Sequence, residues 1–198
     1  RVIVVGYPES FTKFFIPPEP DEIKPTLEDA IKHLEGKEVP AKGKDHHNPE
    51  VKIPNHEYMK GRKFSSHYMS RNRVRSWNKP SYTIQAGGRH APCHPQAPLM
   101  LKTNEKDVFK FKEGKKRLYR RLTVRECASI QTFPEDFIFE YKLLNNGYKM
   151  VGNAVPVEFA KRLAAQVKKD IKQFKVKAKF KKKGRLLDLK KPQLEFDL

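Results

Sequence analysis

Two short runs, residues 121–134 and 147–156, constrain the fold of this chain more than any other part of its sequence. In the first run, Thr123 is followed three residues later by Glu126, the spacing of a capping box, in which each side chain bonds the backbone N–H of the other residue. A short helix is therefore expected to begin at Val124 and to end before the proline that closes the run. The residues expected to face a core are Cys127, Ala128 and Ile130.

The second run predicts a glycine turn, followed by Asn153 and by Pro156 in the first turn of a longer helix. A chain that enters a helix through Gly-Asn leaves backbone N–H groups that can point outward at a ligand. Many helix starts share this pattern, so the residues alone leave a ligand site open. The apolar face expected along the helix consists of Ala160, Leu163, Ala164, Val167 and Ile171.

The charge of the chain indicates an acidic partner. Its 198 residues carry 42 Lys and Arg against 23 Asp and Glu, a formal charge of +19, and nucleic acid is the most common partner of such a chain. A domain with a basic tail is the alternative, since residues 161–191 hold fourteen basic side chains against two acidic ones. The rest of the chain is still basic, so the tail is not the whole explanation.

The composition argues against several other classes of protein. Two cysteines provide no disulfide framework and fit a reducing compartment, and no apolar run approaches the roughly 20 residues of a membrane helix. His46 and His47 lack the spacing of a zinc site. We therefore expect a cytoplasmic protein without a metal. Because the chain begins with Arg1 rather than Met, we also expect it to be part of something longer.

The first residues of the chain predict a buried strand. Residues 2–5 are all Val or Ile and lead to Gly6, as in a strand covered on both faces within a mostly parallel sheet. Such a strand needs a neighbour on each side, and the residues that follow do not supply one. Thr26 then predicts the N-cap of a short helix with acidic residues in its first turn. Residues 36–53 are polar and predict a linker or loop.

An arginine-rich run at residues 70–77 is the expected reading surface for nucleic acid. Its basic side chains alternate with others, so a strand would place Arg71, Arg73 and Arg75 on one face. Arginine forks suit O6 and N7 of guanine in the major groove, with about 1–3 kcal/mol of discrimination for each bidentate pair. Contacts with phosphates, or a merely solvated surface, are the alternatives for any single arginine, and the residues alone leave them open.

The next segment completes this expected surface. Residues 81–86 predict a strand that contains Gln85, and residues 87–89 predict the turn after it, which ends at Arg89. A glutamine suits adenine or a backbone contact.

Residues 121–134 and 147–156 resemble motifs IX and X of the cytosine-C5 DNA methyltransferases, and their spacing fits that family as well. Residues 71–74 (Arg-Asn-Arg-Val) and 85–89 (Gln-Ala-Gly-Gly-Arg) resemble the target recognition loops of the GGCC-recognising, HaeIII-methylase-like bacterial type. The likeness extends from Arg1 to about Lys172.

The resemblance implies an α/β fold. The chain would be the C-terminal part of a Rossmann-like methyltransferase domain, with one or few strands and the motif X helix, and with a small, irregular, mostly β target recognition domain inserted. The implied boundaries are 1–35 for the end of the catalytic domain, 36–120 for the target recognition domain, 121–150 for the motif IX helix and hinge, 151–174 for the motif X helix and 175–198 for a basic tail.

The resemblance also assigns roles to single residues. Arg1 would contact the target cytosine, and Asn153, Ala154 and Val155 would form one wall of the site for S-adenosylmethionine. The residues expected to bind DNA are Arg71, Arg73, Arg75, Gln85 and Arg89.

The reactive groups of the family are absent from these 198 residues. The family's nucleophile belongs to a Pro-Cys motif followed by a Glu-Asn-Val motif, and its cofactor turn has the pattern Phe-x-Gly-x-Gly. Pro92 and Cys93 form a Pro-Cys pair, but they follow the expected strand and no Glu-Asn-Val comes after them. We therefore expect a structural rather than a catalytic role for Cys93, and a buried position on the motif IX helix for Cys127.

The resulting hypothesis is half of a DNA (cytosine-5-)-methyltransferase of a restriction-modification system. It would bind double-stranded DNA, with GGCC as the expected target, and would need an N-terminal half or subunit to transfer a methyl group. The alternatives are a non-catalytic basic nucleic-acid-binding module, such as a methylase remnant, an RNA-binding or ribosomal protein, and a tRNA-directed relative of the same family.

Overall fold

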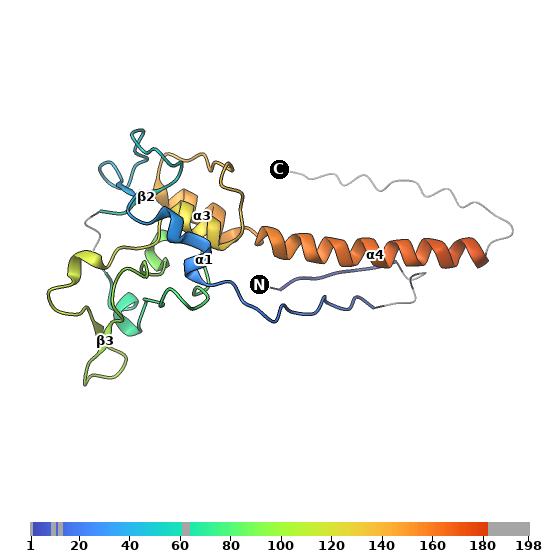
Figure 1. Cartoon of the computed structure of the whole chain (residues 1–198), viewed down its shortest axis with the longest axis horizontal. Coiled ribbons are helices and arrows are strands. Elements are labelled where there is room, and N and C mark those ends of the chain that lie inside the picture. Colours follow the sequence, from blue (N-terminus) through green and yellow to red (C-terminus); the bar gives the residue numbers. More distant parts are fainter. Residues whose placement is uncertain (1, 9–10, 12–13, 61–63, 182–198) are drawn as a thin grey trace. The chain divides into compact units, whose positions relative to one another are not determined.

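The computed structural model of this chain describes residues 2–8, 11, 14–60 and 64–181, with side chains as far as residue 174. The chain divides into two compact units, residues 1–19 with 161–198, and residues 20–160 (Figure 1). Both helices and short strands occur, so the chain has a mixed α/β structure.

Three helices form the centre of the larger unit, residues 20–160. They are α1 (Leu27–Ile31), α2 (Val124–Ile130) and α3 (Leu144–Asn153), and α2 packs against both of the others. The buried side chains at this centre include Leu27, Ile31, Leu122, Val124, Cys127, Ala128, Leu144, Tyr148 and Val151. The first of the two constraining runs therefore contributes a whole helix to the core, as the sequence predicts.

Local side-chain bonds fix the start of two of these helices. The predicted capping box is confirmed, because the Thr123 N–H donates to Glu126 Oε2 at 2.7 Å and the Glu126 N–H donates to Thr123 Oγ1 at 3.1 Å. Thr26 caps α1 in the same way, through reciprocal bonds with Asp29. Each box satisfies backbone donors that the first helical turn would otherwise leave without partners.

The predicted glycine turn at residues 147–152 is wrong, because these residues belong to α3. The glycines serve close packing instead. A Cβ at Gly147 would lie 2.4 Å from the ring of Tyr141, and a Cβ at Gly152 would lie 2.4 Å from the backbone of Ala86. Both distances are far below van der Waals contact, so at these two positions α3 can come this close to its neighbours only because it has no side chain there.

The β structure is limited to two short pairs in the described residues. β1 (Val39–Pro40) and β2 (Glu57–Tyr58) are parallel, whereas β3 (Leu101–Lys102) and β4 (Phe109–Lys110) form an antiparallel hairpin. Four 3-10 turns accompany them: η1 (Lys32–Leu34), η2 (Tyr68–Ser70), η3 (Gly88–His90) and η4 (Lys116–Leu118). Residues 36–120 therefore contain less β structure than predicted, because irregular backbone dominates this range.

Neither strand predicted for the reading surface forms. At residues 70–77 there is a single bridge, between Val74 and Cys93, because the side chain of Asn72 bonds both the N–H and the carbonyl of Val74. Within residues 81–86, the Gln85 carbonyl accepts a turn bond from the Gly87 N–H at 2.8 Å. Such side-chain and turn bonds compete with a strand ladder for the same backbone groups.

A second hydrophobic cluster holds this irregular segment together. Its buried members are Tyr68, Val74, Cys93, Ala97, Met100 and Tyr119. Aromatic side chains surround it: the rings of Phe64 and Phe111 lie 4.9 Å apart, and Phe111 stacks on Tyr119 at 4.3 Å. This cluster fixes the loops that carry the predicted reading residues.

The smaller unit contains the first residues of the chain and most of the long helix α4 (Val157–Lys181). The Tyr7 hydroxyl donates to Asp170 Oδ2 at 2.7 Å, and the rings of Phe11 and Phe174 lie 4.5 Å apart. The strand predicted for residues 2–6 does not form, and Val2 and Val4 are 91% and 87% exposed. No neighbouring strand is present among the described residues to bury them, and an isolated strand is not stable in water.

The helix α4 begins one residue later than predicted. Pro156 precedes it, and its carbonyl accepts the N–H of Ala160 at 2.9 Å. The expected apolar face is largely open, since Ala164, Val167 and Ile171 line a surface hollow together with lysines. Although α4 is 25 residues long, neither it nor any other helix in the described part is apolar enough to cross a membrane.

Candidate nucleic-acid interface

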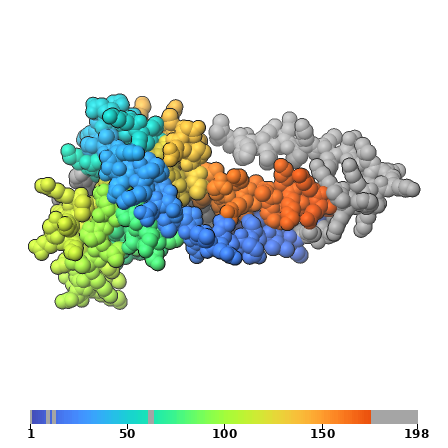
Figure 2. Space-filling view, viewed as in Figure 1, coloured from blue at the N-terminus to red at the C-terminus, as the bar shows by residue number. Residues whose placement is uncertain are grey.

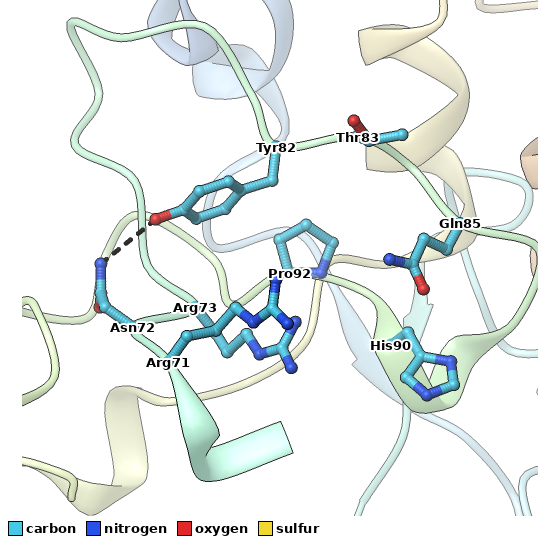
Figure 3. A pocket seen from close by; sticks show the side chains of 8 residues that line it. All are labelled: Arg71, Asn72, Arg73, Tyr82, Thr83, Gln85, His90 and Pro92. Carbon is cyan, nitrogen blue, oxygen red and sulfur yellow. Dashed lines mark hydrogen bonds between the residues drawn. The ribbon is translucent and has the colours of Figure 1, made fainter. Parts of the chain in front are cut away.

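The structure brings three of the five predicted reading residues to one pocket. Arg71, Arg73 and Gln85 line a hollow of about 180 Å³. The other lining residues are Asn72, Tyr82, Thr83, His90 and Pro92. Figure 3 shows the two arginines side by side, with Gln85 and His90 on the opposite side. The lining contains no carboxylate, so the pocket is electropositive.

The two arginines of the pocket differ in their surroundings. Arg71 is exposed, whereas Arg73 is only 8% exposed. The Arg73 Nε donates to the Tyr68 carbonyl at 2.8 Å, and its Nη2 donates to the His67 carbonyl at 2.9 Å. Burial, and then the charge of Arg71, lower the pKa of Arg73. The Arg73 side chain thus shapes the pocket wall, while Arg71 projects a fork that is open to a ligand.

Arg75 reaches the pocket only indirectly. Its guanidinium lies over the ring of Tyr82, 4.5 Å from the ring centroid, and Asn72 donates a long bond of 3.4 Å to the Tyr82 hydroxyl. The Nε of Arg75 is buried without a hydrogen-bond partner among the described residues. The predicted common face of three arginines is therefore not observed, because the run is not a strand.

Arg89 lies in the turn η3, which α3 holds in place. The Gly88 N–H donates to Asn145 Oδ1 at 3.3 Å, and a Cβ at Gly88 would lie within 2.8 Å of Met59 and Tyr148. The side chains of Arg89 and Gln85 are both exposed. The DNA contacts of these residues stay a prediction, but the structure holds their backbone against a rigid helix.

His90 is a pocket residue that the sequence pattern does not single out. Burial, and then His67 and the nearby arginines, lower its pKa, which favours the neutral ring. Its position directly after the Gly-Gly-Arg turn is the only signal that points to it. Tyr82 and Thr83 also line the pocket, although in the sequence they look like ordinary strand residues.

A buried ionic network joins residues 38, 120 and 126. Arg120 donates from Nη1 and Nη2 to the two carboxylate oxygens of Glu126, at 2.8 and 2.7 Å, and from Nε to Glu38 Oε1 at 2.9 Å. Burial would raise the pKa of Glu126, but the bonds and charge of Arg120 outweigh it and lower the pKa to about 2. Glu126 is therefore ionised and caps α2 at the same time.

His94 lies beside this network, and its Nε2 has no hydrogen-bond partner among the described residues. The Gln96 N–H donates to His94 Nδ1 at 3.2 Å, so Nε2 carries the proton of the neutral ring and lies 3.4 Å from Glu126 Oε1. Burial lowers the pKa of His94 to about 4, although the charge of Glu126 opposes this shift. The spacing from Thr123 predicts Glu126 as a capping residue, but no local pattern predicts its partners Glu38, His94 and Arg120.

Neither cysteine is suited to act as a nucleophile. Cys93 is 1% exposed, its Sγ lies 3.3 Å from the Tyr68 hydroxyl, and burial raises the pKa of its thiol. Cys127 is fully buried on α2, and burial raises its pKa as well. A nucleophilic cysteine needs a low pKa and access to its substrate, so both observations agree with the structural roles expected from the sequence.

The residues expected to contact a cofactor lie between α3 and α4. Asn153 is exposed and Val155 is 40% exposed, whereas the Ala154 N–H is bonded to the carbonyls of α3. The first donors of α4 are also used, since Val157 N–H bonds the Gln131 carbonyl and Glu158 N–H bonds Thr132 Oγ1. These three N–H groups already have partners within the chain, and the role of residues 153–155 toward a cofactor stays a prediction.

Comparison with known proteins identifies the class to which this chain belongs. Residues 1–169 match the model of the C-5 cytosine-specific DNA methylases, so the chain is a member of that family. Enzymes of this family transfer a methyl group from S-adenosylmethionine.

The similar proteins are type II methyltransferases. The chain is 56% identical over 172 residues to M.MthTI of Methanothermobacter thermautotrophicus, an alignment that covers 86% of this chain and 51% of the relative. It is 45% identical over 175 residues to M.FnuDI of Fusobacterium nucleatum and 44% identical over 177 residues to M.NgoPII of Neisseria gonorrhoeae. These alignments cover 86% and 87% of the chain and 50% and 51% of the relatives, so the chain spans about half the length of the curated relatives it matches.

Proposed function

We propose that this chain supplies target recognition for a DNA (cytosine-5-)-methyltransferase of a restriction-modification system, with GGCC as the target. The observation that carries the proposal is the pocket in which Arg71, Arg73 and Gln85 meet without a carboxylate. The names of the relatives support a place in a restriction-modification system.

Base reading in this proposal depends on two exposed arginines. Arg71 projects from the pocket and Arg89 from the adjacent turn, and both forks are open to the edge of a guanine. Arg73 holds the pocket wall through the carbonyls of residues 67 and 68 and presents its remaining donor to DNA. Gln85, Tyr82 and Arg75 complete the surface.

The chain would also form part of the catalytic site. Asn153 and Val155 would contact S-adenosylmethionine, which supplies the methyl group, and Arg1 would contact the target cytosine. Arg1 lies outside the described residues. The nucleophilic cysteine and the glutamate that acts on the ring would come from an N-terminal half, in the same polypeptide or in a second subunit.

Two features of the structure support an N-terminal half as partner. Val2 and Val4 are almost fully exposed, although their sequence is that of a buried strand. The apolar side chains of α4 at Ala164, Val167 and Ile171 also line an open hollow. A methyltransferase sheet would cover surfaces of this kind.

Methyl transfer to a GGCC duplex tests the proposal. We expect the 198-residue chain to bind the duplex without transferring methyl groups from S-adenosylmethionine. Transfer is expected after addition of the N-terminal half of M.MthTI, the relative that is 56% identical over the aligned residues. Cys93→Ser should leave the complemented activity unchanged, because this thiol is buried and has a raised pKa. Transfer by the chain alone that Cys93→Ser abolishes would overturn the proposal, as would the absence of any duplex binding.

A further inference from the structure

The hairpin β3–β4 and the turn η4 carry a dense group of positive charges that base reading does not use. Residues 101–117 hold seven basic side chains against three acidic ones. The basic side chains are Lys102, Lys106, Lys110, Lys112, Lys115, Lys116 and Arg117, called the basic hairpin surface below, and all seven are exposed. None of them has an ion pair among the residues that the structure describes.

Alternation along the second strand explains why the charges point outward. Phe109 and Phe111 are half-buried and pack on the second hydrophobic cluster, whereas Lys110 and Lys112 between and after them are exposed. Successive side chains of an extended segment point to opposite faces. The aromatic side chains therefore anchor the hairpin, and the lysines face solvent.

The basic hairpin surface is attached rigidly to the reading residues. Phe111 packs on Phe64 at 4.9 Å, Phe64 packs on Tyr68 at 5.0 Å, and Tyr68 opens the turn that ends at Arg71. The Lys112 N–H also donates to the hydroxyl of Tyr119, a buried member of the same cluster, at 3.0 Å. Figure 2 shows the hairpin as the yellow-green lobe that projects from the larger unit, so its surface is open to a large partner.

We propose that the basic hairpin surface is a second DNA-binding surface, which contacts phosphates of the duplex outside the base pairs that the pocket reads. This inference rests on the proposed function, because it requires the same duplex as partner. Exposed lysines without fixed partners suit phosphates, which they bind as mobile point charges without regard to sequence. The surface would add affinity and hold the register of the protein on DNA, while Arg71 and Arg89 discriminate between bases.

The test compares two triple substitutions with the same change of charge. One variant is Lys110→Gln/Lys112→Gln/Lys116→Gln, and its matched control is Lys37→Gln/Lys44→Gln/Lys52→Gln, three exposed lysines of the same unit outside the hairpin. Equilibrium binding of the full chain is measured at several salt concentrations, on a GGCC duplex and on a random duplex.

The hairpin variant should bind both duplexes more weakly by the same factor. Its plot of log K against log salt should be shallower by about 0.9 for each phosphate that the variant no longer neutralises. The control should keep the slope of the parent chain, and equal unfolding midpoints would show that both variants fold.

Two outcomes would overturn the inference: equal slopes in the two triple variants, or weaker binding confined to the GGCC duplex. If the parent chain bound no duplex DNA, the proposed function itself would fail, so the two failures are distinguishable.

Discussion

Replacing Glu126 by glutamine is expected to lower the free energy of unfolding by about 3–5 kcal/mol. The carboxylate is fully buried and accepts two bonds from Arg120 and one from the Thr123 N–H. A glutamine of the same shape would turn an amide N–H₂ toward one of these donors and would remove the charge, so that the buried Arg120 would keep only Glu38 as an acidic partner. Chemical unfolding of the parent and variant at neutral pH measures the difference.

Glu50→Gln is the matched control, because its side chain is 76% exposed and bonds the exposed Lys42, at 3.0 Å. It should cost less than about 1 kcal/mol, as surface ion pairs do. The fall of the unfolding free energy at acid pH gives a second measurement. The pKa of Glu126 is lowered from 4.5 to about 2, so its contribution is complete above pH 4.5 and is lost as the pH falls toward 2. This part of the acid destabilisation should be absent from Glu126→Gln, and identical pH profiles would contradict the assignment.

Gly152→Ala is expected to lower the free energy of unfolding by about 3 kcal/mol. The new Cβ would lie 2.4 Å from the N and Cα atoms of Ala86 and 2.5 Å from the carbonyl carbon of Gln85. These are backbone atoms, which cannot rotate away, so α3 and the loop of Gln85 would have to separate. The gain of about 1 kcal/mol in helix propensity does not offset this displacement.

Gly43→Ala adds the same methyl group where nothing lies within 4 Å of the Cβ. This control should change the unfolding free energy by no more than about 0.5 kcal/mol. Denaturant unfolding of both variants gives the comparison, and duplex binding by Gly152→Ala reports whether the pocket moves with Gln85. Equal stabilities of the two variants would show that α3 does not pack closely on this loop.

The parts of the fold that depend on local chemistry could be predicted from the sequence. Thr123 and Glu126 lie within one turn of each other, so their reciprocal bonds follow from spacing alone. The helix starts at Val124 and Leu27 are placed correctly for this reason.

The errors arise where distant residues decide the structure. Gly147 and Gly152 favour a turn in the sequence, but Tyr141 and the backbone of Ala86 need the space that a side chain would fill. The predicted strand at residues 2–6 has no neighbour in the described structure, and the strand at 70–77 gives way to the side-chain bonds of Asn72. No single-sequence pattern contains these partners.

The candidate site also has features that the sequence predicts and features that depend on distant residues. Its composition was predictable in part: Arg71, Arg73 and Gln85 line one pocket, whereas Arg75 and Arg89 are not among its lining residues. The hydrogen bonds inside the site could not be predicted, because those from Arg73 to the carbonyls of residues 67 and 68 depend on the fold of η2. The contribution of His90 follows only from the turn η3, which α3 positions through Asn145.

Selective binding of duplex DNA by the parent chain and by Arg89→Ala tests the central claim most directly. The parent should prefer a GGCC duplex over a duplex with one guanine replaced. Arg89→Ala should reduce that preference by about 1–3 kcal/mol at one base pair. Arg117→Ala removes the same charge from an exposed position in η4 and should weaken both complexes equally. Equally weakened binding of both duplexes by Arg89→Ala, or a parent chain without any preference, would contradict the claim that the pocket and its adjacent turn η3 read bases.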